Sequence, residues 1–341
     1  MVPKVSIIVP VYNVGDYVEK CASTIFEQTL DDIEIIFVDD CTPDNSIELI
    51  NKTLESYPHR VPQVKFLHHE TNKGLPQSRY DGLMAATGTY VLNVDSDDFL
   101  SPHMAESLYT KAVETRSDVV ICDYYRWVDE DNCKLMKIHE GPVAEGGKDL
   151  RDDTLNRIIG CFVWIRLIKR DLLCDTRILW PKYSMHEDAV ISSSVMALAQ
   201  HIAYLQEPLY YYRYNPTSIQ HKKTEEAAKN RFIQSVENMH TLCSFLERQG
   251  LAEVYHQGII NGEFETLMLF FPYTGRLSNR ILWHKAFPNC GYIMLHGRSP
   301  YYKRFSRTQY ALTLLGLYGP YFKRALSRNS KSKVKGNSCQ S

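Results

Sequence analysis

Thr89-Tyr90-Val91-Leu92-Asn93-Val94-Asp95-Ser96-Asp97-Asp98 is an apolar run that ends in a cluster of carboxylates. A second apolar run, Glu34-Ile35-Ile36-Phe37-Val38, is followed in the same way by Asp39-Asp40. Carboxylates at the ends of buried strands are costly to desolvate, so their presence suggests a use. In open parallel sheets, ligands bind beyond the carboxyl ends of the strands. The two acidic strand ends therefore predict a ligand site at one edge of a sheet.

Strand and helix patterns alternate around these two runs. The early part of the chain predicts strands at 5–11, 34–38, 64–67 and 89–94, with helices at about 14–26, 45–57 and 75–87. Such alternation predicts an α/β fold in which helices cover both faces of a mostly parallel sheet.

The later segments are less regular. They predict a helix after Ser101-Pro102, a strand at 118–122, a hairpin or mobile loop at 126–150, helices near 148–159 and 187–200, and strand pieces near 201–205 and 209–214. From about residue 222 onward the pattern is helical. We therefore expect a first domain over 1–221 and a helical C-terminal region over 222–341.

Composition and charge limit the class of protein. Apolar residues make up 44% of the chain, which is ordinary for a globular protein. Nine cysteines without regular spacing argue against a disulfide framework and favour a reducing compartment. No signal peptide pattern and no membrane-spanning run are found, so we expect a cytoplasmic protein. All 40 acidic residues lie within the first 265 residues, and 13 basic residues follow them.

The carboxylates of Asp95 and Asp97 are the first candidate metal ligands. They are alternate residues of a segment that we expect to be extended, so both side chains would project to the same side. Neighbouring carboxylates repel each other unless a cation lies between them. A hard divalent ion with oxygen ligands, Mn²⁺ or Mg²⁺, would meet that need. The alternative is a turn with helix-capping acids, and Asp39-Asp40 could likewise cap the helix after Pro43.

Three further groups of polar residues each have a structural and a functional interpretation. Lys73, Gly74 and Arg79 lie at a helix N-terminus, where amides and a guanidinium suit a phosphate, although a solvated loop would look the same. Glu187 and Asp188 could stabilise a helix N-terminus, or Asp188 could act as a general base. The aromatic stretch 210–215 could be a packed strand edge or a wall for a sugar or base.

Taken in order, these motifs resemble family 2 glycosyltransferases, whose catalytic domain has the GT-A, Rossmann-like architecture. The resemblance covers about residues 4–220. It rests on Val5-Ser6-Ile7-Ile8-Val9-Pro10-Val11-Tyr12-Asn13, Val38-Asp39-Asp40, Asn72-Lys73-Gly74, Ala86-Thr87-Gly88-Thr89-Tyr90 with Asp95-Ser96-Asp97-Asp98, Glu187-Asp188, and Tyr212-Arg213 to Ser218. The chain departs from the family at Cys41-Thr42-Pro43, where Gly-Ser-Thr is common, at Tyr80, where Asn is common, and at Arg166, where Lys is frequent.

The resemblance implies a role for each matched residue. The nucleotide-sugar donor would be bound by Pro10, Tyr12, Asn13, Asp39, Asp40, Lys73, Gly74, Arg79, Asp95, Ser96 and Asp97. Asp39 or Asp40 would accept a hydrogen bond from the base, and Asp95 and Asp97 would bind the metal. Asp188 would be the catalytic base. The acceptor or phosphate side would include Trp164, Lys169, Glu187, Arg213 and Ser218.

The implied reaction is transfer of a sugar, with inversion, from a nucleotide diphosphate sugar to an acceptor hydroxyl. A UDP-sugar is the first candidate donor, Mn²⁺ or Mg²⁺ the cofactor, and a glycan or lipid-linked molecule the acceptor, as in polysaccharide or surface-glycan biosynthesis. Two alternatives remain: a sugar-phosphate nucleotidyltransferase, and a non-catalytic scaffold that binds nucleotide sugars.

The basic C-terminal region has its own two interpretations. The segment 310–322 is uncharged, mostly apolar and flanked by basic residues, but it is too short to cross a bilayer. It could lie in the headgroup layer on the inner face of the membrane, or pack on the body of the protein as a terminal helix. No motif supports a nucleic-acid partner.

Overall fold

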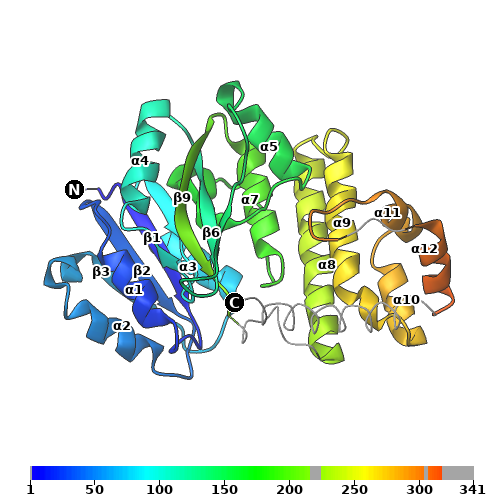
Figure 1. Cartoon of the computed structure of the whole chain (residues 1–341), viewed down its shortest axis with the longest axis horizontal. Coiled ribbons are helices and arrows are strands. Elements are labelled where there is room, and N and C mark those ends of the chain that lie inside the picture. The colour runs from blue at the N-terminus through cyan, green and yellow to red at the C-terminus, as the bar shows by residue number, and fades with distance from the viewer. Residues whose placement is uncertain (1, 216–223, 303–305, 317–341) are drawn as a thin grey trace, which may run out of the picture.

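The computed structural model describes residues 2–215, 224–302 and 306–316. Its first part alternates strands and helices as the sequence predicts (Figure 1). These elements are β1 (Val5–Val11), α1 (Val18–Phe26), β2 (Ile33–Asp39), α2 (Ser46–Leu54), β3 (Val64–His68), α3 (Leu75–Ala85) and β4 (Tyr90–Asn93). Strand β1 has exactly the expected bounds, and the predicted helices begin or end a few residues differently.

The following part of the chain contains the rest of the sheet and three longer helices. Its elements are β5 (Phe99–Leu100), α4 (Met104–Thr115), β6 (Val119–Trp127), β7 (Cys133–Met136), α5 (Lys148–Leu155), β8 (Arg166–Lys169), α6 (Arg170–Leu173), α7 (Glu187–Leu198) and β9 (Ile202–Arg213). The expected hairpin is present, because β7 pairs with β6 in antiparallel orientation. The short strands β5 and β8 are not evident in the sequence pattern.

The described strands form one nine-stranded sheet in the order β3-β2-β1-β4-β8-β6-β9-β5, with β7 beside β6. Its first four strands are parallel, and β8 then runs antiparallel to β4 and β6. Strand β1 lies between β2 and β4, with Val11 opposite Asp39 and Ile8 opposite Asn93. This register brings the acidic ends of β2 and β4 to the same edge of the sheet.

The predicted strand pieces at 201–205 and 209–214 are one continuous strand, β9. Its pairing with β6 shifts register next to Asp123, where Pro208 stands opposite. Proline has no N–H to donate to a ladder, so a bulge lets the strand continue past it. The sequence therefore predicted two strands, because the middle of β9 is polar and contains a proline.

A buried glutamate joins the starts of β1, β3 and β4. The Glu34 carboxylate accepts hydrogen bonds from Ser6 Oγ at 2.5 Å, from Lys65 Nζ at 2.8 Å and from the Gly88 amide at 2.9 Å. Burial alone would raise the pKa of Glu34, but these donors and Thr87 outweigh it and lower the pKa to about 2. Gly88 is needed there because a Cβ would lie 2.7 Å from the Ser6 nitrogen.

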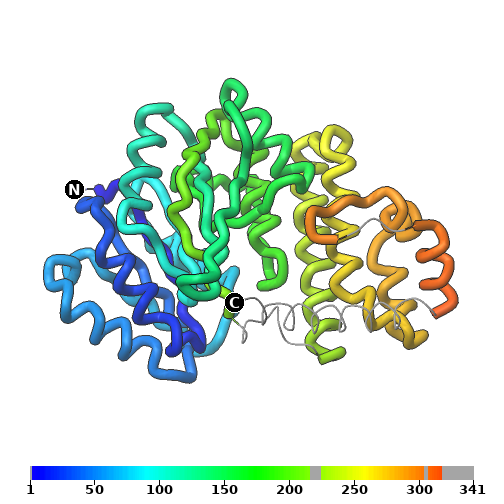
Figure 2. Tube along the Cα trace, viewed as in Figure 1, coloured from blue at the N-terminus to red at the C-terminus, as the bar shows by residue number. Residues whose placement is uncertain are grey.

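The C-terminal region is helical, as expected, and has a core of its own. Its helices are α8 (Glu225–Arg248), α9 (His256–Phe270), α10 (Leu277–Lys285), α11 (Cys290–His296) and α12 (Arg307–Leu314). Aromatic side chains dominate this second core, including Phe232, Phe264 and Trp283. Figures 1 and 2 show the helices stacked beyond one end of the sheet, with α7 between the sheet and α8. Among the described helices, none is long and apolar enough to span a bilayer.

Candidate functional site

The carboxyl edge of β1 and β2 carries the first set of expected donor-binding residues. Pro10 is the second-last residue of β1, and Tyr12, which directly follows the strand, is 48% exposed. Asn13 adopts a left-handed conformation with φ of 54°, and its amide donates to Thr42 Oγ1 at 2.8 Å. Asp39 Oδ1 accepts from the Thr42 amide at 2.8 Å. The turns after the two strands are therefore tied to each other.

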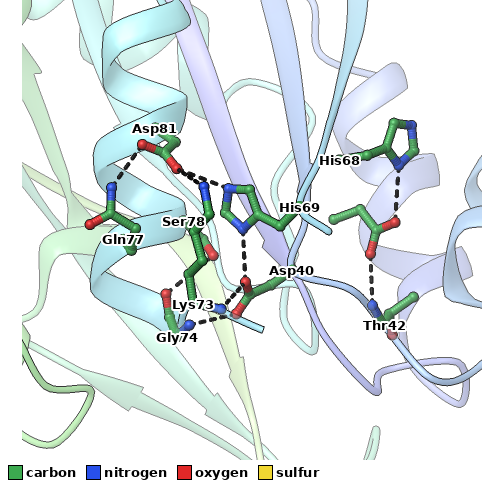
Figure 3. Close-up of polar contacts among 10 residues, drawn as sticks. Asp40, Thr42, His68, His69, Lys73, Gly74, Gln77, Ser78 and Asp81 are labelled. Atoms are coloured by element: carbon green, nitrogen blue, oxygen red, sulfur yellow. Dashed lines mark hydrogen bonds and ion pairs between the residues drawn. The ribbon is translucent and has the colours of Figure 1, made fainter. Parts of the chain in front are cut away.

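Asp40 is buried and fully engaged within the protein (Figure 3). Its two oxygens accept from the amides of Lys73 at 2.7 Å and Gly74 at 2.8 Å. Oδ1 also lies 2.8 Å from His69 Nδ1. Gly74 has φ of 87° and precedes α3, a backbone conformation that favours glycine. Asp40 thus holds the loop before α3. Of the two aspartates expected to accept a hydrogen bond from the base of a nucleotide, the more accessible Asp39 remains the better candidate.

His69 connects Asp40 with α3 and was not anticipated. Its side chain is 5% exposed, and its Nε2 lies 2.9 Å from Asp81 Oδ2 without the alignment of a hydrogen bond. Lys73 Nζ pairs with the same Asp81 oxygen at 3.2 Å (Figure 3). The Lys73 side chain is therefore directed to α3 in this structure. His69 could have been predicted from the sequence, because it directly follows β3 at the same edge of the sheet as Asp39 and Asp40.

The acidic segment after β4 is a turn and not an extended strand. The Asp98 amide donates to the Asp95 carbonyl at 3.0 Å. Even so, burial alternates as expected: Ser96 and Asp98 are buried, whereas Asp95 and Asp97 are partly exposed. Asp97 Oδ2 accepts from Asn215 Nδ2 at 2.9 Å. The two candidate metal ligands are thus the accessible acids of the turn.

The buried members of the turn are held by β9. Tyr210 donates its hydroxyl to Asp98 Oδ2 at 2.7 Å, and the Arg213 amide donates to Asp98 Oδ1 at 2.7 Å. The Asp95 amide donates to the Tyr210 hydroxyl at 3.2 Å. Trp164 stacks on the Tyr210 ring at 4.4 Å between centroids. The aromatic stretch of β9 is therefore the support of the acidic turn.

Arg79 joins the acidic turn to the start of α7. Its guanidinium, 2% exposed, lies 2.5 Å from Asp95 Oδ1, 2.8 Å from Glu187 Oε1 and 3.0 Å from Asp188 Oδ1. We expected this arginine to approach a phosphate, but the structure directs it to carboxylates because α3 packs its inner face on β1 and β2. Asp95 and Asp188, which are distant in the sequence, consequently lie around one side chain.

The site carries more negative charge than Arg79 can balance. Burial raises the pKa of Asp95, and the charges of Asp188 and Asp97 raise it further. The positive charge of Arg79 lowers it, but the net result is a pKa of about 6. Burial and the neighbouring Asp188 also raise the pKa of Glu187 well above its usual value. Burial and the charges of Asp97 and Asp95 likewise raise the pKa of Asp98 well above its usual value. Such repulsion marks the place where a bound cation would be most favourable.

The remaining expected residues are placed less directly. Trp164 is buried behind the acidic turn. The Arg213 guanidinium lies against the rings of Tyr17, Phe99 and Trp127, at 5.2 to 5.4 Å from their centroids. Lys169 is not brought to the site. It pairs with Tyr90 at the opposite end of β4, because β8 is antiparallel to that strand. Ser218 lies outside the described residues.

The donor set fits a divalent cation that is shared with a substrate. Within the described ranges, no three His, Cys, Asp or Glu side chains come together as a complete metal cluster. Mg²⁺ usually takes only one or two carboxylates from a protein and completes its shell with water and substrate phosphates. Asp95 and Asp97 supply that number of partly exposed carboxylates, within a surplus of negative charge. The residues present therefore suit a metal that binds together with a diphosphate.

Comparison with other sequences gives a family match over the part of the chain that builds this site. The family model described as Glycosyl transferase family 2 matches residues 6–173. The glycosyltransferase GlyG of Streptococcus pneumoniae is 30% identical over 227 residues, which are 63% of this chain and 72% of GlyG. Two further glycosyltransferases, from Bacillus subtilis and Escherichia coli, are 35% and 33% identical, and the match spans 63% of the length of each.

Solved structures share the fold at low sequence identity. TarS from S. aureus, solved in complex with UDP-GlcNAc, has a TM-score of 0.55 and 19% identity, with 83% of this chain and 87% of that chain covered. The mannosyltransferase PcManGT from Pyrobaculum calidifontis, solved with GDP-Man and Mn²⁺, has a TM-score of 0.53 and 13% identity, with 95% and 87% covered. The expected GT-A fold is thereby confirmed. The chain belongs to glycosyl transferase family 2.

Proposed function

We propose that the protein transfers one sugar from a nucleotide diphosphate sugar, with a UDP-sugar as the first candidate, to the hydroxyl of a glycan or lipid-linked acceptor. The observation that carries this proposal is the Arg79 bridge. It joins Asp95, one of the two accessible acids of the turn after β4, to Asp188 at the carboxyl edge of the sheet. A donor-binding group and a proton acceptor at one edge are what a transferase needs. The role would be in polysaccharide or surface-glycan biosynthesis.

In the proposed mechanism Asp188 is the general base. A free hydroxyl is a weak nucleophile near neutral pH, so Asp188 would take its proton as the acceptor oxygen attacks the anomeric carbon. The bond from that carbon to the diphosphate oxygen breaks, and attack from the opposite face inverts the centre. Arg79 holds Oδ1 of Asp188 and so orients the carboxylate. Glu187, whose pKa burial and the charge of Asp188 raise, accepts from the same guanidinium at 2.8 Å.

The donor would lie along the edge from Tyr12 to Asp97. Tyr12, Asn13 and Asp39 would contact the nucleoside, and Asp95 and Asp97 would hold Mn²⁺ or Mg²⁺ next to the diphosphate. When bound, the metal offsets the charge that develops on the departing diphosphate. The structural neighbour PcManGT, which was solved with GDP-Man and Mn²⁺, supports this choice of ion.

A panel of nucleotide sugars incubated with the protein and Mn²⁺ tests the function. We expect release of UDP or GDP from one donor, strongly increased by its acceptor. Replacement of Asp97 by alanine should abolish the Mn²⁺-dependent part of donor binding in calorimetry, because one of two metal carboxylates is lost. Pyrophosphate exchange without nucleoside diphosphate release would favour a nucleotidyltransferase instead. Donor binding without any turnover would favour a scaffold.

We propose further that 1–221 form the catalytic domain and that the helical remainder contacts a membrane. The division between the two falls outside the described residues. Exposed Leu277, Ile281 and Leu315 lie on α10 and just after α12. The end of α12 meets α10, since a Cβ on Gly316 would lie 2.0 Å from Arg280 Nη1. Apolar side chains next to basic ones suit the surface of an anionic bilayer.

Truncation after Pro300 tests the membrane contact. The full chain should co-sediment with phosphatidylglycerol vesicles. The truncated chain keeps Leu277 and Ile281 but loses Leu315 and nine of the 13 basic residues, so it should co-sediment much less. The effect should weaken at high salt, because the basic side chains contribute electrostatically. Equal binding by both chains would contradict this role for the C-terminal region.

A further inference from the structure

The turn that leads into Glu187 and Asp188 is held by the C-terminal region. Asn238, in the middle of α8, donates its side-chain amide to the carbonyl oxygens of Tyr183 at 2.6 Å and Met185 at 2.8 Å. The side-chain oxygen of Asn238 accepts a hydrogen bond from the Tyr183 amide at 3.4 Å. Asn238 is 1% exposed, so these hydrogen bonds are shielded from water.

A second residue of α8 holds the next position of the same turn. Ser235 is fully buried, and its hydroxyl lies 2.7 Å from His186 Nδ1 and 2.9 Å from Thr266 Oγ1 on α9. Burial, with the charge of Arg157, lowers the pKa of His186 to about 3, so the ring is neutral at physiological pH. The contact is thus a neutral hydrogen bond that joins α7, α8 and α9.

The held turn has an unusual backbone conformation. His186 has φ of 62° and ψ of 27°, the left-handed region that a residue with a side chain adopts at a cost. It is the residue immediately before the first turn of α7, which carries Glu187 and Asp188. A costly conformation persists only when its surroundings determine it, and Asn238 and Ser235 supply those surroundings here. No larger ligand explains the junction, since the adjoining cavity of about 10 Å³ is the size of one water.

We propose that Asn238 is a positioning residue for Asp188, so that the helical C-terminal region sets the geometry of the catalytic base. Arg79 donates a hydrogen bond to Asp188 from the side of the sheet. Asn238 holds the backbone of Tyr183 and Met185, five and three residues before Asp188. Without Asn238 the turn can relax from its left-handed conformation, and the first turn of α7 can shift relative to the donor. This inference rests on the proposed function, in which Asp188 takes the proton of the acceptor.

Asn238→Ala tests the proposal by separating turnover from donor binding. A displacement of about 1 Å at a reacting group can cost on the order of 100-fold in rate, so we expect kcat to fall by about 10- to 100-fold. The donor KM and the donor Kd in calorimetry should stay unchanged, because the donor site at the sheet edge is not touched. An equal loss of donor affinity and kcat would overturn the proposal.

Asn261→Ala is the matched control. Asn261 on α9 is also buried, donates to the Asn156 carbonyl at 2.9 Å and accepts from the Arg298 amide at 2.9 Å, away from the turn at 183–186. Both variants should lower the melting temperature, but only Asn238→Ala should lower kcat. If Asn238→Ala does not fold, Ser235→Ala provides the same comparison. Equal kcat in the variant and its control would overturn the proposal.

A double variant separates this inference from the function on which it rests. If Asn238 acts through Asp188, then adding Asn238→Ala to Asp188→Asn should cause no further loss of kcat. Additive losses would show that Asn238 acts by another route and would overturn the positioning role. Normal turnover of Asp188→Asn alone would instead refute the proposed base.

Discussion

Replacement of Asp188 by asparagine should lower kcat by about 100- to 10,000-fold, the usual cost of losing a positioned base. Asparagine has the same shape and can still accept the hydrogen bond from Arg79, but it cannot take a proton from the acceptor. Donor binding should persist, because the expected nucleoside contacts, Tyr12, Asn13 and Asp39, lie at the carboxyl ends of β1 and β2. Single-turnover kinetics with saturating donor, together with donor calorimetry, would measure the two effects separately.

Asp118→Asn is the control for this variant. Asp118 is also a partly buried aspartate with a basic neighbour, Lys169, at 3.7 Å, and it accepts the amides of Gln200 and His201. It precedes β6 at the opposite edge of the sheet from the acidic turn. Its turnover should match that of the unmodified protein. Near-normal turnover of Asp188→Asn would remove Asp188 from the role of base.

Replacement of Arg79 by methionine should destabilise the protein by about 3–5 kcal/mol, as is typical when one partner of a buried ionic group is removed. Burial by itself would lower the pKa of Arg79, but Asp95, Asp188 and Glu187 raise it, so the side chain is firmly charged. Methionine fills much of the space and leaves three carboxylates without their shared cation. Urea denaturation at neutral pH would measure the change in the free energy of unfolding.

An exposed ion pair gives the comparison for Arg79. Arg177 lies 2.7 Å from Asp175, but its side chain is 54% exposed. Arg177→Met should leave the free energy of unfolding nearly unchanged, because water already solvates both charges. If Arg79→Met and Arg177→Met lowered the free energy of unfolding by similar amounts, the stabilising role of the Arg79 bridge would be wrong. In that case relaxation or protonation of the carboxylates would have compensated the missing charge.

Much of the first half could be predicted because its signals are local. The strands β1 to β4 are continuous apolar runs that helical patterns separate, and a single pattern of this kind predicts parallel pairing. β9 was harder, since Pro208 interrupts the pattern and a bulge repairs it only through pairing with β6. The short strands β5 and β8 have no pattern of their own, because two to four residues are too few to show a period.

Most residues of the candidate site could be named from sequence, but their partners could not. Asp95 and Asp97 were predicted to project to the same side of an extended segment; both are partly exposed, but they lie in a turn. Arg79 was expected near a phosphate, and its protein partners in the structure are carboxylates. His69 was overlooked beside Asp40, although its position after β3 follows the same rule that singled out the acids.

The amino-acid sequence by itself determined the order of strands and helices from β1 to β4, the acidic ends of β2 and β4 and the family, since apolar periodicity and motif order are properties of neighbouring residues. The tertiary structure alone decided which distant side chains meet. Arg79 and Glu187 are 108 residues apart, and Asn238 reaches Met185 across 53 residues. Such contacts depend on how α3, α7 and α8 pack around the sheet, and packing is a property of surfaces that no local pattern records.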